Sequence, residues 1–330
     1  MANGRMIATV AGLLAVAAVA ATVLPRLFTA PNPDAGYTIT GRLVTSALAA
    51  KDGTSSIAAD GPHLWATDGD AVEELNASNG AVIRTLSGGR YQFIQPTGIA
   101  ADGDHVWVID GSSLTELDAS DGAVIRVLSG DQYARIQPSS IADDGTHLWV
   151  AGSSGEWDDP AISPDGLLLN HGNGSVTELS ASDGSVIRTL SGSKYQFNDP
   201  AGIASDGTDV WVTNLDDGRW VIELNASNGS VIRTLPSIAA PGTDLMVEPY
   251  PHGIATDGTR VWIADYGNNL VTELNASNGK IIRSLSDGSH FSTSSYEWGY
   301  NFPNAVAVES THVWITSNTG LAELTLGKSP

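Results

Sequence analysis

Aromatic and acidic side chains gather in the parts of this sequence where a repeated pattern is interrupted. The candidates for ligand binding in these parts are Trp157, His171, Trp220, Tyr250, Tyr296, Trp298 and Tyr300. Their neighbours in the sequence include acidic residues such as Asp158, Asp216 and Glu297. Aromatic faces attract cationic groups, and aromatic anchors dominate the energetics of many binding surfaces. These residues therefore predict a surface that binds a protein, a peptide or a glycan.

Two other polar sets recur at fixed places in the repeat. Glutamates stand in all six copies, at Glu74, Glu116, Glu178, Glu223, Glu273 and Glu323. Arginines follow them in five copies, at Arg84, Arg126, Arg188, Arg233 and Arg283. A ring of glutamates alone would suit a cation, but an arginine repeated beside each one indicates ion pairs between neighbouring strands.

Histidines occupy one position of the repeat in four copies, at His63, His105, His147 and His312. Asp209 and Arg260 stand there in the other two copies. Because both signs of charge are accepted, this position indicates a solvated turn rather than a set of metal ligands.

The repeat itself predicts the elements that position these residues. One tryptophan marks each copy, at Trp65, Trp107, Trp149, Trp211, Trp262 and Trp314, with successive steps of 42, 42, 62, 51 and 52 residues. Self-similarity at a period of about 40–50 residues is typical of propellers and solenoids. Since a tryptophan buries a large apolar area, we expect the six rings to form core between repeats.

Each copy contains four short strands and no helical periodicity. In the second copy they are expected at residues 98–100, 105–108, 114–117 and 124–128. Asp121-Gly122 supplies the tight turn between the last two strands. Six such units predict an all-β fold, a six-bladed β-propeller of four-stranded antiparallel blades.

The two ends of the chain predict how the ring closes. The last copy stops after its third strand at Leu326 and lacks a fourth. Residues 41–48 resemble a fourth strand, but the first three strands of a copy do not precede them. Gly41 to Thr45 align with Gly80 to Arg84, the start of a fourth strand in the first copy. We therefore expect residues 41–48 to complete the last blade, in a propeller domain that covers residues 38–330.

Insertions indicate which face of the propeller binds. Loops between second and third strands share one face with the connections between blades, and the remaining turns lie on the other face. Four insertions, at residues 152–174, 214–220, 236–250 and 287–301, all belong to the first group. Loops on a rigid scaffold are common sites of binding. We call this side of the molecule the insertion-bearing face.

Composition narrows the partners and the location. The formal net charge of −21 disfavours nucleic acid and anionic membranes as partners. Residues 6–24 are apolar and uncharged, so residues 1–29 are expected to be a signal peptide or an N-terminal membrane anchor, followed by a linker at 30–37. We expect an extracytoplasmic protein, secreted or anchored by residues 6–24, and a monomer.

One copy carries a resemblance to known families. Pro251-His252-Gly253-Ile254, followed by Val261 to Val271, looks like an NHL repeat. The chain resembles the NHL and YVTN-like propeller superfamily and is distantly similar to streptogramin (virginiamycin B) lyases. Those lyases use His and Glu around a divalent metal near the ring axis, which implies His252 as a base with Asp265 as an acidic neighbour. Asn304 stands where a second histidine would complete the pattern.

A resemblance to propeller lactonases implies a second possible metal site. They bind calcium at the pore through oxygen ligands, and Asp68, Asp110, Asn214 and Asp265 end second strands of this chain. Two functions follow. The first is an exported or membrane-tethered binding scaffold that uses the insertion-bearing face. The alternative is a metal-dependent lyase or lactonase with calcium or magnesium at the propeller pore.

Overall fold

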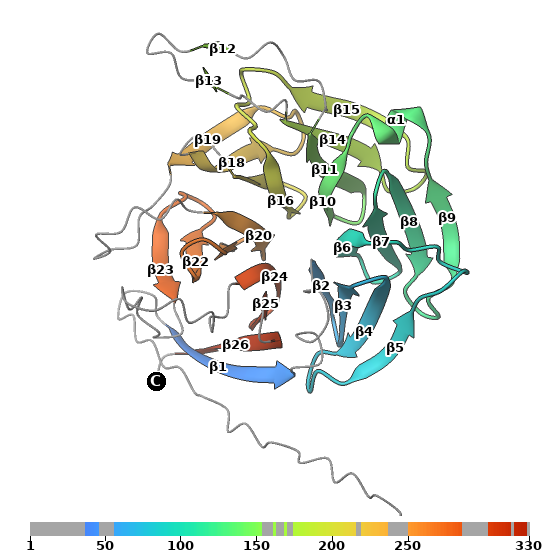
Figure 1. Cartoon of the computed structure of the whole chain (residues 1–330). Helices are drawn as coiled ribbons and strands as arrows, with labels where there is room; N and C mark the ends of the chain where they lie inside the picture. The colour runs from blue at the N-terminus through green and yellow to red at the C-terminus, as the bar shows by residue number, and fades with distance from the viewer. Residues whose placement is uncertain are drawn as a thin grey trace, which may run out of the picture.

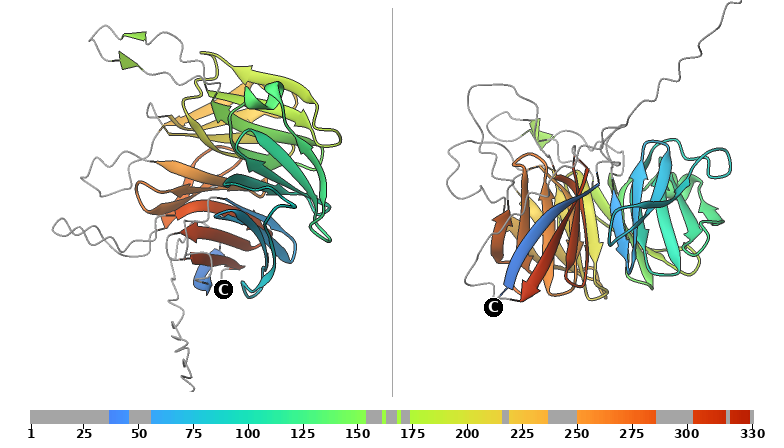
Figure 2. Two further views of the ribbon diagram at one scale, coloured as in Figure 1. Left: turned by 45° about the vertical axis from the view of Figure 1, so that its right-hand side comes forward. Right: turned by 90° about the horizontal axis from the view of Figure 1, so that it is seen from below.

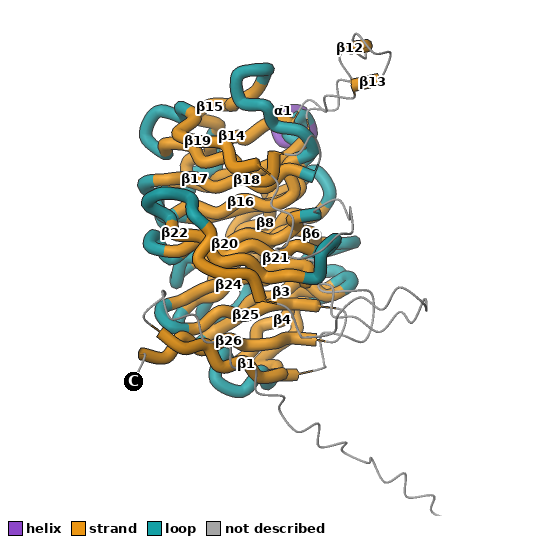
Figure 3. The backbone as a smooth tube through the Cα atoms, turned by 90° about the vertical axis from the view of Figure 1, so that its left-hand side faces the viewer, coloured by secondary structure: helices purple, strands orange, loops and turns teal. Residues whose placement is uncertain are grey.

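The computed structural model describes residues 37–45, 56–153, 161–162, 168–169, 174–215, 219–236, 250–285, 303–317 and 320–328. Six four-stranded antiparallel sheets surround a central axis like the blades of a propeller (Figure 1). Seen edge-on, the strands run between the two faces of the disc (Figure 3). The predicted six-bladed propeller is confirmed.

The blades are numbered from the N-terminus, and the strands of each blade are given in order from the innermost, at the axis, to the outermost. Blade 1 contains β2 (Ile57–Asp60), β3 (His63–Asp68), β4 (Ala71–Asn76) and β5 (Val82–Leu86). Blade 2 contains β6 (Pro96–Ala101), β7 (His105–Asp110), β8 (Ser113–Asp118) and β9 (Val124–Leu128). Blade 3 contains β10 (Pro138–Asp143), β11 (His147–Ser153), β14 (Gly174–Ser180) and β15 (Val186–Ser191). Blade 4 contains β16 (Pro200–Ser205), β17 (Asp209–Asn214), β18 (Arg219–Asn225) and β19 (Val231–Pro236).

The last two blades and the minor elements complete the ring. Blade 5 contains β20 (Pro251–Thr256), β21 (Arg260–Asp265), β22 (Leu270–Asn275) and β23 (Ile281–Leu285). Blade 6 contains β24 (Pro303–Glu309), β25 (His312–Ser317), β26 (Gly320–Lys328) and β1 (Tyr37–Thr45). A four-residue helix, α1 (Asp131–Ala134), lies between blades 2 and 3, and β12 (Ala161–Ile162) pairs with β13 (Leu168–Leu169) in the blade 3 insertion.

Small residues are required where the first strands crowd together at the axis. A Cβ atom on Gly253 of β20 would lie 2.6 Å from the Cα atom of Ala305 in β24. A Cβ atom on Gly202 of β16 would collide with the backbone carbonyl of His252. Glycine permits this close backbone approach. The contact between neighbouring first strands therefore fixes the spacing of the blades around the axis.

The six repeated tryptophans form the core between blades, as predicted. Each is buried, with at most 3 % of its surface exposed. Trp107 of β7, for example, lies in one apolar cluster with Ile141, Leu148 and Val150 of blade 3. Equivalent clusters join every neighbouring pair of blades, including blade 6 to blade 1 through Trp314. Apolar burial therefore stabilises the ring at each of its six seams.

A buried polar row lies beside each tryptophan. In blade 2, Trp107, Glu116 and Arg126 stand opposite one another on three adjacent strands. Arg126 forms an ion pair with Glu116, and its Nη2 donates to the carbonyls of Ala181 (3.1 Å) and Ser182 (2.9 Å) in blade 3. Its guanidinium carbon lies 5.4 Å from the centre of the Trp107 ring. The predicted ion pair is thus also a link to the next blade.

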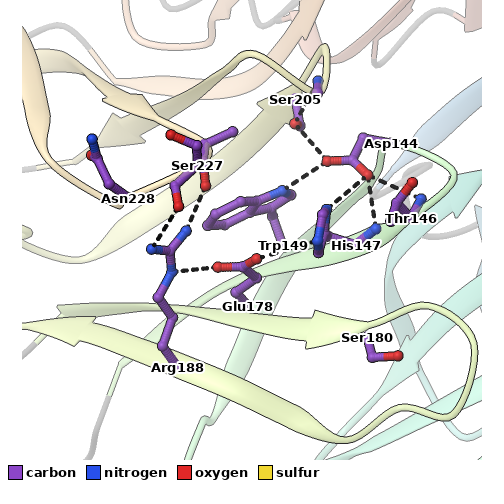
Figure 4. Close-up of polar contacts among 12 residues, drawn as sticks. Asp144, Thr146, His147, Trp149, Glu178, Ser180, Arg188, Ser205, Ser227 and Asn228 are labelled. Atoms are coloured by element: carbon purple, nitrogen blue, oxygen red, sulfur yellow. Dashed lines mark hydrogen bonds and ion pairs between the residues drawn. The ribbon is translucent and has the colours of Figure 1, made fainter.

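We call this arrangement the inter-blade clasp: a third-strand glutamate, a fourth-strand arginine of the same blade, and carbonyls in the turn before the next blade's fourth strand. Blades 1, 3 and 4 repeat it through Arg84, Arg188 and Arg233. Figure 4 shows Arg188 between Glu178 of its own blade and the Ser227 carbonyl of blade 4. Charge-assisted hydrogen bonds of this kind are stronger than neutral ones.

The N-terminal strand closes the ring. β1 pairs antiparallel with β26 and completes blade 6 as its outer strand (Figure 2). It begins at Tyr37, four residues earlier than expected, and residues 46–48 lie outside the described part of the chain. The register places Arg42 opposite Glu323, as Arg84 stands opposite Glu74.

The alignment of Gly41 with Gly80 was therefore wrong by three residues, because it would have put Thr45 at the arginine position. Gly80 has a φ of 68° because it belongs to the turn between β4 and β5. Blade 6 has no such turn, since its outer strand comes from the other end of the chain. Matching the two glycines consequently had no structural basis.

The repeated histidines contact the clasp glutamates. His63 Nδ1 lies 2.5 Å from Glu74 Oε1, and His312 Nδ1 lies 2.6 Å from Glu323 Oε1. The side chains of these two histidines are 41 % and 43 % exposed, so the position is partly solvated, as expected. It is nevertheless more than a turn, because the imidazole contacts a buried carboxylate.

No helix within the described ranges is long and apolar enough to span a membrane. The expected signal peptide or anchor, with its apolar segment at 6–24, and most of the linker lie outside those ranges. Both stay predictions.

The register of β1 predicts a fifth clasp, at Arg42. We expect Arg42→Met to lower the free energy of unfolding by about 2 kcal/mol, as Arg126→Met should, because each leaves a buried glutamate without its arginine. Chemical denaturation measures both, with the exposed Arg135→Met as control. An Arg42→Met variant as stable as the Arg135 control would show that β1 pairs in a different register.

Blade 4 predicts a pH dependence of stability. Burial raises the pKa of Glu223 to about 7; Arg233 opposes this, and Asp209 and Asp206 raise it further. Because this folded pKa exceeds the unfolded value of 4.5, the folded state binds more protons between about pH 4.5 and 7, and stability falls as pH rises through that window.

We expect Asp209→His, which restores the residue found in four other blades, to remove the repulsion and stabilise the protein by about 1 kcal/mol at pH 8. Melting curves between pH 5 and 8 should also become flatter, with Asp209→Asn separating loss of charge from gain of the imidazole. An unchanged slope in both variants would contradict the electrostatic explanation.

Candidate functional site

The observed strand order fixes where the four insertions attach. They join β11 to β14, β17 to β18, β19 to β20 and β23 to β24. In antiparallel blades these are connections from a second to a third strand or from one blade to the next, so all four leave from the same face. The first strands of the blades begin at this face, five of them with a proline.

A cavity of about 380 Å³ lies on the axis among these strand starts. All six blades contribute to its wall. The polar side chains that line it include Thr97, Ser139, Ser140, Asp199, His252 and Asn304. We call it the axial cavity.

Within the regular strands, the blades differ from one another where they meet this cavity. Five first strands begin with proline, and the next residue is Thr97, Ser139, Ala201, His252 and Asn304 in turn. One position further on, the residues are all small, because of the crowding at the axis. The variable side chains thus sit on a scaffold that holds their backbones in place.

His252 is held from three sides. Its Nδ1 lies 2.8 Å from Oδ1 of Asn304 in the next blade. Its ring stacks on Tyr266 at 5.3 Å between centroids and contacts Tyr250 at 5.2 Å. Its backbone carbonyl accepts a hydrogen bond from Thr213 Oγ1 at 3.3 Å. Because an amide oxygen only accepts, this contact puts the ring proton on Nδ1 and leaves Nε2 as an acceptor.

Asp265 has a different environment from the one that a catalytic partner of His252 needs. It is 1 % exposed, and Oδ1 accepts hydrogen bonds from the backbone N–H groups of Tyr250 (3.0 Å) and Asn268 (3.1 Å). The Asn268 side chain donates to Oδ2 at 2.8 Å. These three donors occupy the carboxylate, so it fixes the connection that leads into β20.

Asp110 and Asn214 do the same work in other blades. Asp110 accepts from the backbone N–H groups of Ile94 and Gln95, at 3.1 and 2.9 Å. Asn214 accepts from Asn198 N at 3.3 Å and donates to the Gln196 carbonyl at 3.2 Å. Within the described ranges, no group of three or more His, Cys, Asp or Glu residues has the arrangement to hold a metal ion.

The aromatic binding candidates divide into two groups. Tyr250 is 43 % exposed and stands directly before β20, next to His252. Trp220 belongs to β18, and its side chain lies outside the described part of the chain. Trp157, His171, Tyr296, Trp298 and Tyr300 also lie outside it.

The repeated aromatic residues of the connections have a structural role. Tyr195 stacks on Phe197 at 5.3 Å, and both are buried. Tyr91 and Tyr133 donate from their hydroxyls to the carbonyls of Gly122 and Gly184, each at 3.0 Å. These side chains therefore seal the gaps between blades.

Two further side chains belong to the site: Asp199, one of the acidic residues expected on the insertion-bearing face, and Tyr266, which the sequence did not single out. Asp199 lines the axial cavity from the connection before β16, where it adopts a φ of 49°. Tyr266 supports the His252 ring from the turn after Asp265. The Asp-Tyr-Gly-Asn sequence of that turn was visible, but nothing in it showed which ring it would meet.

No protein-family model matches the sequence, and no curated protein matches it. The chain is similar to solved structures in its fold rather than in its sequence. The chain is similar to the WD40 repeats of RRP9, with a TM-score of 0.57, 11 % identity, and coverage of 91 % of this chain and 100 % of that one. It is similar to virginiamycin B lyase from Staphylococcus aureus, with a TM-score of 0.55, 14 % identity, and coverage of 88 % and 99 %.

A third similar structure is hydrazine synthase from Kuenenia stuttgartiensis, with a TM-score of 0.52, 18 % identity, and coverage of 87 % and 97 %. These similarities establish a propeller. The expected resemblance to lyase-like and related propellers is confirmed for the fold.

The environment of Asp265 predicts how its variants behave. We expect Asp265→Ala to lower the free energy of unfolding by about 2 kcal/mol, because the buried N–H groups of Tyr250 and Asn268 lose their acceptor. Asp265→Asn should cost about half as much, since Asn214 accepts a backbone hydrogen bond at this position in blade 4. Urea titrations measure both; an asparagine variant as unstable as the alanine variant would contradict the structural role.

Proposed function

We propose that this protein is a binding scaffold whose insertion-bearing face receives a ligand, with the axial cavity at its centre. The observation that supports this is the pattern of variation at the cavity. Residues after the first-strand proline differ among the five blades that have one, whereas the clasps of blades 1 to 4 and the tryptophan core of all six seams repeat the same residues. Because packing does not require the same residue at this position in each blade, the side chains there can differ to suit a ligand.

Rigid support favours this function. The first strands contact one another directly at the axis, so groups from different blades are held in a fixed arrangement before a ligand arrives. A preorganised site loses less conformational entropy on binding than a flexible one. Insertions around such a site add contact area without disturbing the blades.

Two exposed apolar side chains on the same face are suitable anchors. Ile94, in the connection from blade 1 to blade 2, is 83 % exposed, and Tyr250 is 43 % exposed. Large apolar groups that find a pocket in a partner supply much of the binding energy at interfaces. The partner is a protein, a peptide or a glycan, and the acidic charge of the chain disfavours nucleic acid.

Export belongs to the same proposal. The apolar segment at 6–24 supports secretion or tethering to a membrane, with the propeller outside the cytoplasm.

The metal-dependent lyase or lactonase is the second candidate. The imidazole of His252 beside a cavity supports it, because a base there would meet a bound substrate. The bonded state of Asp265 speaks against that residue as the acidic partner. Asp265→Asn separates the two functions, since a metal-binding or catalytic carboxylate does not survive conversion to an amide.

The binding proposal predicts where substitutions interfere. We expect full-length protein, in mild detergent, to bind members of a peptide or glycan array. A variant with both Tyr250→Ala and Ile94→Ser should lose at least tenfold in affinity, because two anchors are removed from the insertion-bearing face.

Ile125→Ser is the matched control, because Ile125 is 48 % exposed on the outer strand of blade 2. An array ligand that both variants bind equally well would place binding elsewhere on the molecule. If the protein binds no ligand on the peptide array or on the glycan array, the proposal is wrong.

A further inference from the structure

The wall of the axial cavity is unsuited to an anion. Among the described residues that line it there is no lysine and no arginine, whereas Asp199 contributes a carboxylate. A phosphate or carboxylate group would lose hydration there without gaining a positive partner, which is costly. The cavity therefore selects a neutral or cationic ligand.

The hydrogen-bonding groups of the wall come from separate blades. Ser139 Oγ donates to the Pro200 carbonyl at 2.7 Å, which commits its proton and leaves the oxygen to accept. His252 offers an acceptor at Nε2, because Asn304 holds Nδ1. Thr97 contributes a hydroxyl that can donate or accept. The wall thus offers acceptors from two blades and, from a third blade, a hydroxyl that can donate.

The size and the neighbouring aromatic ring restrict the ligand further. About 380 Å³ falls at the lower end of the range for small-molecule sites, which suits one small unit rather than an extended chain. Tyr250, which contacts the His252 ring, presents an exposed aromatic side chain beside the cavity. An aromatic surface with an apolar body packs well against the carbon–hydrogen face of a ring that is otherwise covered in hydroxyls.

We infer that the axial cavity binds one neutral sugar unit. His252 Nε2 accepts a hydrogen bond from one hydroxyl, the Asp199 carboxylate accepts from another, and Tyr250 packs against the sugar ring. Asn304 is a positioning residue, because it sets the tautomer that makes Nε2 an acceptor. The inference rests on the proposed binding function and names the ligand class for the centre of that face.

The test uses full-length protein and four probes: the methyl glycosides of glucose, galactose, mannose and N-acetylglucosamine. We expect at least one to bind with a dissociation constant of about 1 mM, as suits a ligand of this size. Binding should shift the nitrogen NMR signals of His252, and the free protein should show its proton on Nδ1. His252→Phe should weaken binding at least tenfold, whereas His252→Gln, which keeps an acceptor, should weaken it less.

His105→Phe is the matched control, because His105 begins the second strand of blade 2 and contacts Glu116 rather than the cavity. Asn304→Leu should weaken binding and shift the His252 proton toward Nε2, an effect that a purely structural role would not produce. The inference fails if none of the four probes disturbs the His252 signals at about 10 mM. It also fails if His252→Phe binds as the wild type does.

Two further probes test the charge argument. Choline that binds at His252 in place of the glycosides would identify a cation site, and glucuronate that binds as well as glucose would contradict the exclusion of anions. If array ligands bind in a way that depends on Tyr250 and Ile94 but none of the four glycosides binds, the binding function is supported and the sugar inference is wrong. If neither the arrays nor the glycosides give binding, the proposed binding function and the sugar inference are both wrong.

Discussion

The ring depends on carboxylates that are buried between blades. Glu116 is 2 % exposed, and a buried charge of this kind is strongly destabilising unless it is paired and hydrogen-bonded. Arg126 supplies the pairing and at the same time donates to two carbonyls of the following blade. The carboxylate is neutralised within its own blade, but the remaining donors of the guanidinium find their acceptors only when the next blade is in place. Repetition of this dependence in blades 1 to 4 favours side-by-side assembly of the blades, and the pairing of β1 with β26 closes the ring.

Much of this arrangement was predictable from the sequence, because repeated residues do repeated work. The tryptophan core and the glutamate–arginine pairs followed from their spacing alone. The register of β1 did not, because sequence matching gave weight to Gly41, whereas pairing places Arg42 beside Glu323. Only the strand partner distinguishes a glycine that makes a turn from one that does not.

The candidate site was predictable in part for a related reason. His252 and Asn304 were recognised as variable positions, but the role of Asp265 depends on backbone N–H groups that a sequence does not display. Acidic residues at strand ends suggest ligands when they are read alone. In this fold they accept from the connection that precedes the first strand, as Asp110 and Asn214 also do. Short-range backbone contacts thus explained residues that a family resemblance had assigned to chemistry.

The same crowding that fixes the blades also determines what the axial cavity can become. Gly202 and Gly253 are held small by the neighbouring first strand, so chemical variety at the axis is confined to the residue before each of them. In blades 5 and 6 that residue is His252 or Asn304, and the two are joined across the seam between their blades. A site built in this way gains one side chain from each blade and cannot rearrange them without moving the ring. It is suited to recognising a small ligand by the spacing of its polar groups, and a different ligand requires only a change at this one position in each repeat.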